Sequence, residues 1–206
     1  MPELRFGSAG TLLLASLLIM GSPGPATISL TAAGSAYGLR RSLGYLAGIV
    51  VGTTLVLVAV ATGITAALLA VPGLRPVLIG ISAAYILWLA YKVATAPALA
   101  AGRAVGSPSF AGGVLLGVAN PKAWVAIAAV FTSARLAGAT ATDAAAKVVL
   151  LSAMIVLINT AWLVAGASLA PFLRDPRRAR VVNVTLAAAL VAAAALAMLG
   201  PGILVT

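Results

Sequence analysis

Two short motifs in this 206-residue chain carry the residue types most suited to ligand chemistry: Ser22-Pro23-Gly24-Pro25 and Asn120-Pro121-Lys122. Proline lacks a backbone N–H and clashes with the preceding turn, so each motif predicts an interruption in any helix that contains it. A helix that restarts after Pro25 presents unpaired N–H groups and a positive dipole end, which suit a carboxylate. Lys122 adds an ammonium group. The helix end and Lys122 are therefore two candidates for binding a carboxylate.

The composition identifies the elements that must position these motifs. Hydrophobic residues make up 63% of the chain and charged residues 8%, with a mean hydropathy of +1.17. A soluble domain needs roughly 25% charged residues, so an integral membrane protein is predicted. A crossing takes about 20 apolar residues. Apolar runs between charges and turn residues predict spans at 6–30, 43–66, 76–93, 110–133, 145–170 and 181–203.

The two interruptions occupy matching places in two halves of the chain. Pro121 follows Pro23 by 98 residues, which is close to half the length. We expect one membrane domain over 1–206, with repeat one at about 1–98 and repeat two at about 99–206. Because each half has three spans, the second must insert upside down. Paired interruptions in inverted halves indicate a secondary transporter with its site near the bilayer midplane.

The expected fold is therefore all-α: a polytopic membrane protein with six transmembrane helices, arranged as two inverted three-helix repeats. Its first and fourth helices are broken. Irregular backbone persists in a membrane only where protein or a water-filled cavity covers it. A simple proline kink inside a packed bundle is the alternative explanation of the first motif.

Lys122 lies deep in its predicted span. It follows Phe110 by twelve residues, or about 18 Å of helix. A central ammonium is costly unless it finds a partner or a wet cavity. The three acidic residues, Glu3, Asp143 and Asp175, fall at span ends or in loops. We expect Lys122 to face a cavity and to meet an anionic group of the substrate. The alternative is that Lys122 extends to the membrane interface.

Two further residues are candidates for contacting substrate. Tyr85 belongs to an aromatic series with Trp88 and Tyr91 that fits an interfacial belt, and it could line the cavity instead. Asn159 is an amide in the fifth span that either bonds a neighbouring helix or touches substrate. Gly44, Gly48 and Gly52 recur every four residues, a spacing that favours close helix packing.

Missing residue types exclude several classes of function. The chain has no cysteine and no histidine, which removes disulfides, thiolate metal sites and imidazole chemistry. No metal site or cofactor is expected. Neither a histidine-dependent nor an aspartyl intramembrane protease fits the sequence, so no enzymatic activity is predicted. The net charge is +10, and the basic residues responsible for it lie between apolar runs. Contacts with anionic lipid and the orientation of the chain in the membrane explain these residues better than nucleic-acid binding does.

The distribution of Lys and Arg predicts the orientation. Eight of these residues fall in the first, third and fifth connections: Arg40, Arg41, Lys92, Arg103, Arg174, Arg177, Arg178 and Arg180. Four fall on the opposite side: Arg5, Arg75, Arg135 and Lys147. Positively charged loops stay in the cytoplasm. We therefore expect a multi-pass protein of the cytoplasmic (inner) membrane with both termini outside.

With these motifs in place, the sequence resembles the lysine exporter (LysE/RhtB) family of amino-acid efflux transporters. The resemblance is carried by Ser22-Pro23-Gly24-Pro25, the glycines Gly38, Gly44, Gly48 and Gly52, the segment Tyr85-Ile86-Leu87-Trp88-Leu89, and Gly117 with Asn120-Pro121-Lys122. The last two spans match only in hydropathy and length.

The resemblance implies a secondary transporter that exports amino acids or close derivatives by alternating access, driven by the proton gradient or the membrane potential. Because no carboxylate is expected within the membrane, neutral amino acids are favoured over lysine and arginine. The expected substrate-binding residues are Ser22, Pro23, Gly24, Pro25, Tyr85, Asn120, Pro121, Lys122 and Asn159. The partners are the amino acid and the lipid bilayer, and a homodimer is left open. A non-transporting membrane scaffold or assembly protein is the alternative function.

Overall fold

The structure is a computed structural model that describes residues 6–63, 74–95, 108–169 and 175–199, and every regular element within these ranges is helical. In chain order these are α1 (Phe6–Ala15), a π-helical turn η1 (Ser16–Met20), α2 (Pro25–Tyr37), α3 (Leu39–Ala61), α5 (Leu74–Ala94), α6 (Phe110–Ala119), α7 (Pro121–Thr132), α8 (Thr140–Ser168) and α9 (Pro176–Leu199). The predicted all-helical class is confirmed.

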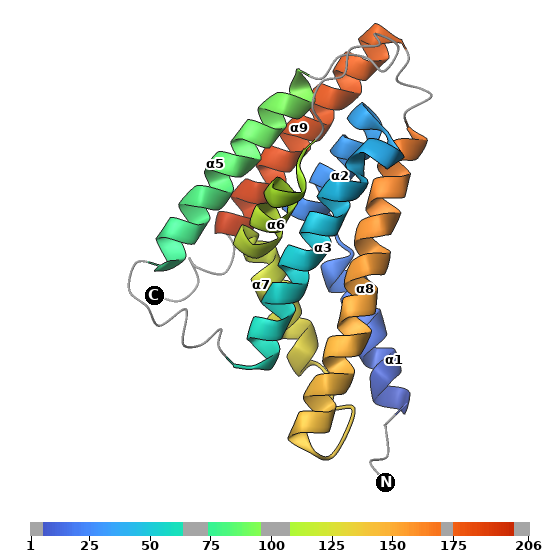
Figure 1. Cartoon of the computed structure of the whole chain (residues 1–206), viewed down its shortest axis with the longest axis vertical. Helices are drawn as coiled ribbons and strands as arrows, with labels where there is room; N and C mark the ends of the chain where they lie inside the picture. Colours follow the sequence, from blue (N-terminus) through green and yellow to red (C-terminus); the bar gives the residue numbers. More distant parts are fainter. Residues whose placement is uncertain (1–5, 64–73, 96–107, 170–174, 200–206) are drawn as a thin grey trace.

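Both predicted interruptions are present. The axis turns by 67° between Gly7–Met20 and Pro25–Tyr37, and by 59° between α6 and α7. These two bent pairs, together with α3 and α8, are long and apolar enough to cross a membrane. Successive segments run in alternating directions along the bundle in Figure 1, with α5 and α9 paired at one side. The full six-span inverted arrangement stays a prediction.

Several helices extend further than the apolar runs indicated. The first span was expected to end at residue 30, whereas α2 continues to Tyr37. Helix α3 begins at Leu39, α8 at Thr140 and α9 at Pro176, each four or five residues before the predicted start. Apolar length measures the hydrocarbon-spanning part, but a helix satisfies its own backbone and continues through polar flanks such as Arg40 and Arg41.

The most extensive helix contacts join the two halves of the chain: α3 with α6, α2 with α8, and α5 with α9. Glycines allow the first two pairs to approach backbone to backbone. A Cβ atom on Gly48 would collide with the carbonyl of Phe110, and one on Gly166 with the carbonyl of Thr31. Gly44, in contrast, has open space around it. Only part of the glycine series therefore serves packing.

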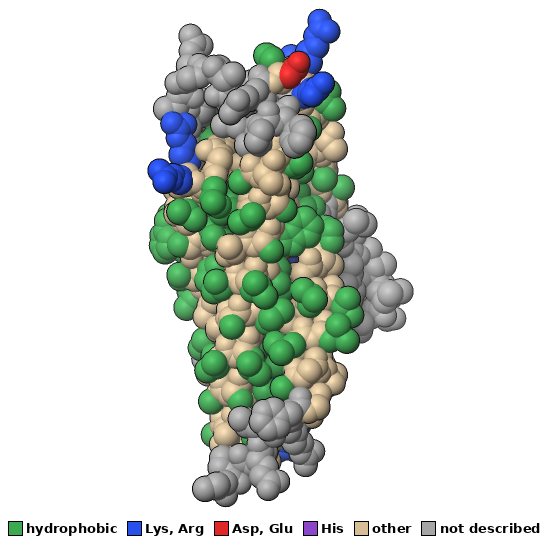
Figure 2. Space-filling view, turned by 90° about the vertical axis from the view of Figure 1, so that its right-hand side faces the viewer, with side chains coloured by type: hydrophobic (Ala, Val, Ile, Leu, Met, Phe, Trp, Pro, Cys, Tyr) green, Lys and Arg blue, Asp and Glu red, His purple; other side chains and the backbone are tan. Residues whose placement is uncertain are grey.

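The outer surface matches a membrane environment. Apolar side chains cover the middle of the face drawn in Figure 2, and charged side chains gather at one end. Leu14, Leu18 and Leu157 are each more than half exposed. Arg40 and Arg41 at the start of α3 and the arginines at the start of α9 are exposed as well. These apolar helices and their exposed apolar surface indicate an integral membrane protein.

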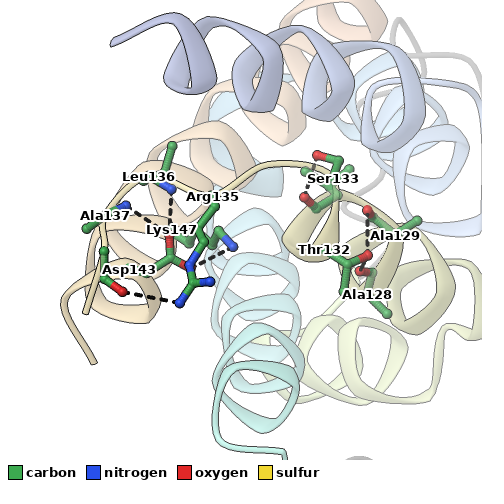
Figure 3. Close-up of polar contacts among 11 residues, drawn as sticks. Ala128, Ala129, Thr132, Ser133, Arg135, Leu136, Ala137, Asp143 and Lys147 are labelled. Carbon is green, nitrogen blue, oxygen red and sulfur yellow. Dashed lines mark hydrogen bonds and ion pairs between the residues drawn. The ribbon is translucent and has the colours of Figure 1, made fainter. Parts of the chain in front are cut away.

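A buried ion pair fixes the turn between α7 and α8 (Figure 3). The Asp143 carboxylate accepts hydrogen bonds from the N–H groups of Leu136 and Ala137 and lies 2.8 Å from the Lys147 ammonium. That ammonium also lies 4.9 Å from the centroid of the Phe131 ring. From the sequence, Lys147 was counted on the non-cytoplasmic side, near the start of the fifth span, and its burial was not predicted. It is buried on α8 because its partner one turn earlier compensates its charge.

Candidate functional site

The first break begins where η1 ends at Met20 and lasts until α2 restarts at Pro25. Gly24 is extended at this point and serves as the N-cap of α2. Its N–H donates to the Thr27 hydroxyl at 2.9 Å. This side chain in the first turn of α2 accepts the hydrogen bond because the start of a helix has no backbone carbonyl available for that N–H. The first turn of α2 is thus fixed in place with its positive end toward the break.

Carbonyl groups freed by the first break are bound by side chains from the second half of the chain. The Lys122 ammonium donates to the carbonyls of Ser22 and Pro23, the latter at 3.2 Å. The Trp162 indole on α8 donates to the carbonyl of Gly21 at 3.1 Å. These bonds replace the helical partners that the proline residues remove. Lys122 was expected to face a cavity. Its hydrogen bonds to the backbone of the first break are an additional structural role that the sequence analysis did not predict.

The second break is organised in a related way. Asn120 caps α7, and its Oδ1 accepts a hydrogen bond from the N–H of Lys122 at 3.1 Å. The Trp124 indole donates to the carbonyl of Val118 at 2.7 Å. In each break a tryptophan thus satisfies a carbonyl that has lost its helical partner. The position of both tryptophans inside apolar spans, away from an interfacial belt, was the available signal for this role.

Gly24 allows the two breaks to meet. A Cβ atom at this position would lie 2.5 Å from Cδ of Lys122 and 3.1 Å from its Nζ. Any other residue at 24 would displace the lysine stem that packs across it. The glycine requirement here comes from close approach, because the Gly24 backbone is extended with φ −166° and open to any residue type.

A small cavity of about 40 Å³ lies where the breaks, α3 and α8 converge. Its polar lining is Thr27, Thr53, Asn120, Lys122 and Asn159, and its apolar lining includes Met20, Ile127, Ile155 and Ile158. This volume holds about three water molecules. The site is therefore narrow in this structure, and we call this arrangement the contracted site.

The cavity brings together four of the predicted site residues: Gly24, Asn120, Lys122 and Asn159. Ser22, Pro23, Pro25 and Pro121 form the breaks without belonging to the described lining. Tyr85 lies on α5, and its side chain falls outside the described residues. Thr53 was not predicted, because a lone threonine in an apolar span carries no distinguishing pattern.

Asn159 is 6% exposed and lies on α8. Its Nδ2 donates to the carbonyl of Ile155 at 2.8 Å, which is a bond within its own helix. Its Oδ1 has no hydrogen-bond partner. The prediction that this amide bonds a neighbouring helix finds no such bond among the described contacts, and one acceptor in the cavity wall is left for another group.

The charge around the cavity is one-sided. Lys122 is the only charged residue in the described lining, and no carboxylate belongs to it. Asp143 is committed to Lys147 and two amides. Asp175 is exposed at the start of α9, where it accepts hydrogen bonds from the N–H groups of Arg177 and Arg178. The arrangement can bind a carboxylate through Lys122, but it offers only neutral acceptors to a cation.

A comparison with protein-family models finds a match to "LysE type translocator" over residues 17–201. Curated proteins similar in sequence include the "Cysteine/O-acetylserine efflux protein" of Salmonella typhi and that of Salmonella paratyphi A (strain ATCC 9150 / SARB42). Each is 40% identical to this chain over 84 residues, which cover 40% of this chain and 43% of the relative. The alignment thus spans less than half of these relatives. No solved structure matches the chain significantly.

Proposed function

Because this chain belongs to the LysE type translocator family, we propose that it exports small neutral amino acids or close derivatives across the cytoplasmic membrane. The family and the names of the relatives describe transport and confirm the prediction that the protein is not an enzyme. The observation that carries the proposal is the cavity between the two helix breaks, which has Lys122 in its otherwise uncharged wall. Cysteine and O-acetylserine, named for the relatives, are the first substrates to test.

In the proposed complex the substrate carboxylate pairs with the Lys122 ammonium beside the first turn of α2. An ammonium buried in this way binds a carboxylate more strongly than it does in water. Ser22, Pro23, Gly24, Pro25, Asn120 and Pro121 act through the backbone geometry of the breaks. A lysine or arginine substrate would bring a second cation into the cavity. Because no carboxylate belongs to the described lining, binding of these two amino acids is disfavoured.

Alternating access in this proposal begins with competition for Lys122. In the contracted site its ammonium donates to Ser22 and Pro23 of the other half. A substrate carboxylate takes over these hydrogen bonds and releases the contact between the breaks. Repeat one, 1–98, then rocks against repeat two, 99–206, with the breaks as hinges. The membrane potential or the proton gradient supplies the driving force.

The proposed orientation places both termini outside and the arginine-rich end in the cytoplasm. The first turns of α3 and α9 lie at the same end of the bundle (Figure 1), and they carry exposed Arg40, Arg41, Arg177, Arg178 and Arg180. Positive residues retained on the cytoplasmic side explain this asymmetry. A scaffold protein has no need of an ammonium group in the wall of an internal cavity, so no second function is proposed.

The decisive experiment is an export profile. Cells that overproduce the chain are expected to release one or a few neutral amino acids, such as cysteine or O-acetylserine, faster than cells with an empty vector. Intracellular and extracellular amino acids are measured by mass spectrometry after dipeptide loading. Equal release of every amino acid by the two strains would contradict the proposed function, and selective release of lysine or arginine would contradict the proposed substrate class.

Thiol labelling tests whether the breaks border a wet cavity. The chain has no native cysteine, so Ser22→Cys and Asn120→Cys each introduce a single reactive group. We expect both to react with a membrane-impermeant maleimide and to be protected by the exported amino acid. Leu157→Cys is the matched control, because residue 157 is 60% exposed on the outer face of α8 and meets lipid. Complete inertness at both break positions would indicate a dry, sealed bundle.

A further inference from the structure

Asn159 lines the cavity, and its hydrogen bonding shows which end of its amide is unpaired. Its Nδ2 is held by the carbonyl of Ile155, and exchanging the two ends of the amide would set oxygen against oxygen. The Oδ1 atom is therefore the end left without a partner. A buried acceptor without a hydrogen bond costs about 1–3 kcal/mol. Such an atom in a site wall indicates a ligand group that completes it.

The residues around Asn159 restrict which kind of ligand group can pair with its Oδ1 atom. Ile155 and Ile158 on the same helix and Ile127 on α7 provide an apolar wall. The Thr27 hydroxyl is already engaged with the backbone of Gly24, both as acceptor and as donor. The free position therefore needs a hydrogen-bond donor. In an amino acid whose carboxylate lies at Lys122, that donor is the α-ammonium.

We propose that Asn159 Oδ1 accepts a hydrogen bond from the substrate's α-ammonium and so determines that the protein selects α-amino acids over simple carboxylates. This inference rests on the proposed function and assigns each end of the zwitterion to its own residue. An amide oxygen provides a dipole rather than a full charge. It therefore orients the ammonium without creating a site for free cations, and it lets the substrate leave after transport.

The test uses three compounds that differ only in these two groups: L-cysteine, 3-mercaptopropionate, which lacks the amine, and cysteamine, which lacks the carboxylate. Purified protein in liposomes is loaded with L-cysteine under reducing conditions, and the external compounds compete for counterflow. We expect the wild type to prefer cysteine to 3-mercaptopropionate by about tenfold or more, as befits a hydrogen bond to a charged group. Asn159→Leu should reduce this ratio to about one.

Two further variants separate recognition from a general structural effect. Asn159→Asp keeps an acceptor, so it should restore the preference for cysteine and strengthen competition by cysteamine. Asn183→Leu removes another buried amide, on α9, that does not belong to the cavity lining. It should keep the wild-type ratio even if less protein accumulates, because the ratio does not depend on the amount of protein.

The outcomes distinguish this inference from the function on which it rests. If wild-type liposomes show no cysteine counterflow, cysteine is not a substrate and this inference, as stated for cysteine, is overturned; the export profile then decides whether the proposed function stands. If the wild type discriminates and Asn159→Leu discriminates equally well, export stands and Asn159 does not bind the amine.

Discussion

Replacing Lys122 by methionine is expected to abolish export while the protein stays inserted in the membrane. Methionine fills a similar volume, but it cannot pair with a carboxylate, and no other cation belongs to the described cavity lining. Efflux of the exported amino acid from preloaded cells, normalised to the amount of protein in the membrane, measures the effect. Normal efflux by Lys122→Met would contradict both the site and the role of the ammonium.

The structural contact of Lys122 makes a second variant necessary. The methionine variant leaves the carbonyls of Ser22 and Pro23 without their donor, at a cost of about 1–3 kcal/mol each where water cannot replace it. Lys122→Arg retains the charge and the hydrogen-bond donors. It should restore the amount of folded protein more fully than it restores export, because the planar guanidinium does not fit the same close geometry. A variant with normal thermal stability and no export separates recognition from folding.

Gly24→Ala provides an independent way to move the same ammonium. The new Cβ atom would meet the flexible stem of Lys122 rather than a backbone atom. The lysine therefore shifts, and the fold is expected to persist. Export should fall several-fold with little loss of protein. If Gly24→Ala exports at the wild-type rate, the position of the ammonium over the first break is unimportant for transport.

The largest expected effect on folding is that of Gly166→Ala. Its Cβ atom would collide with the carbonyl and Cα of Thr31, and both α2 and α8 are held at this contact by backbone atoms that cannot rotate away. Overpacking of this kind typically costs about 1–3 kcal/mol, occasionally more. We expect a sharply lower yield of monodisperse protein and a lower melting temperature in detergent.

Gly44→Ala is the matched control for that variant. The substitution is the same, but beyond the local backbone of its own helix no atom lies within 4 Å of the added Cβ atom. Alanine is favoured over glycine in a helix by about 1 kcal/mol, so this variant should be as stable as the wild type or more so. Equal stability of Gly166→Ala and Gly44→Ala would show that α2 and α8 do not approach backbone to backbone at this contact.

The sequence alone determined the membrane character of this protein and the places where its helices break. Both follow from covalent or compositional properties: proline removes a donor wherever it stands, and a chain with 8% charged residues cannot solvate a surface. The sequence also identified Lys122, Asn120 and Asn159 as candidate site residues, because polar groups in apolar spans are costly. The helix limits were less accurate, since polar flanks continue the helix.

Tertiary structure alone decided which groups satisfy the breaks. Lys122 and Trp162 bind carbonyls that lie about 100 and 140 residues away in the chain, and no local pattern encodes such a pairing. Packing likewise determined that Gly166 faces the backbone of another helix whereas Gly44 does not. It also determined the burial of Lys147 beside Asp143. Proline acts on its own helix, whereas the donor that replaces a lost hydrogen bond comes from whichever helix lies nearest.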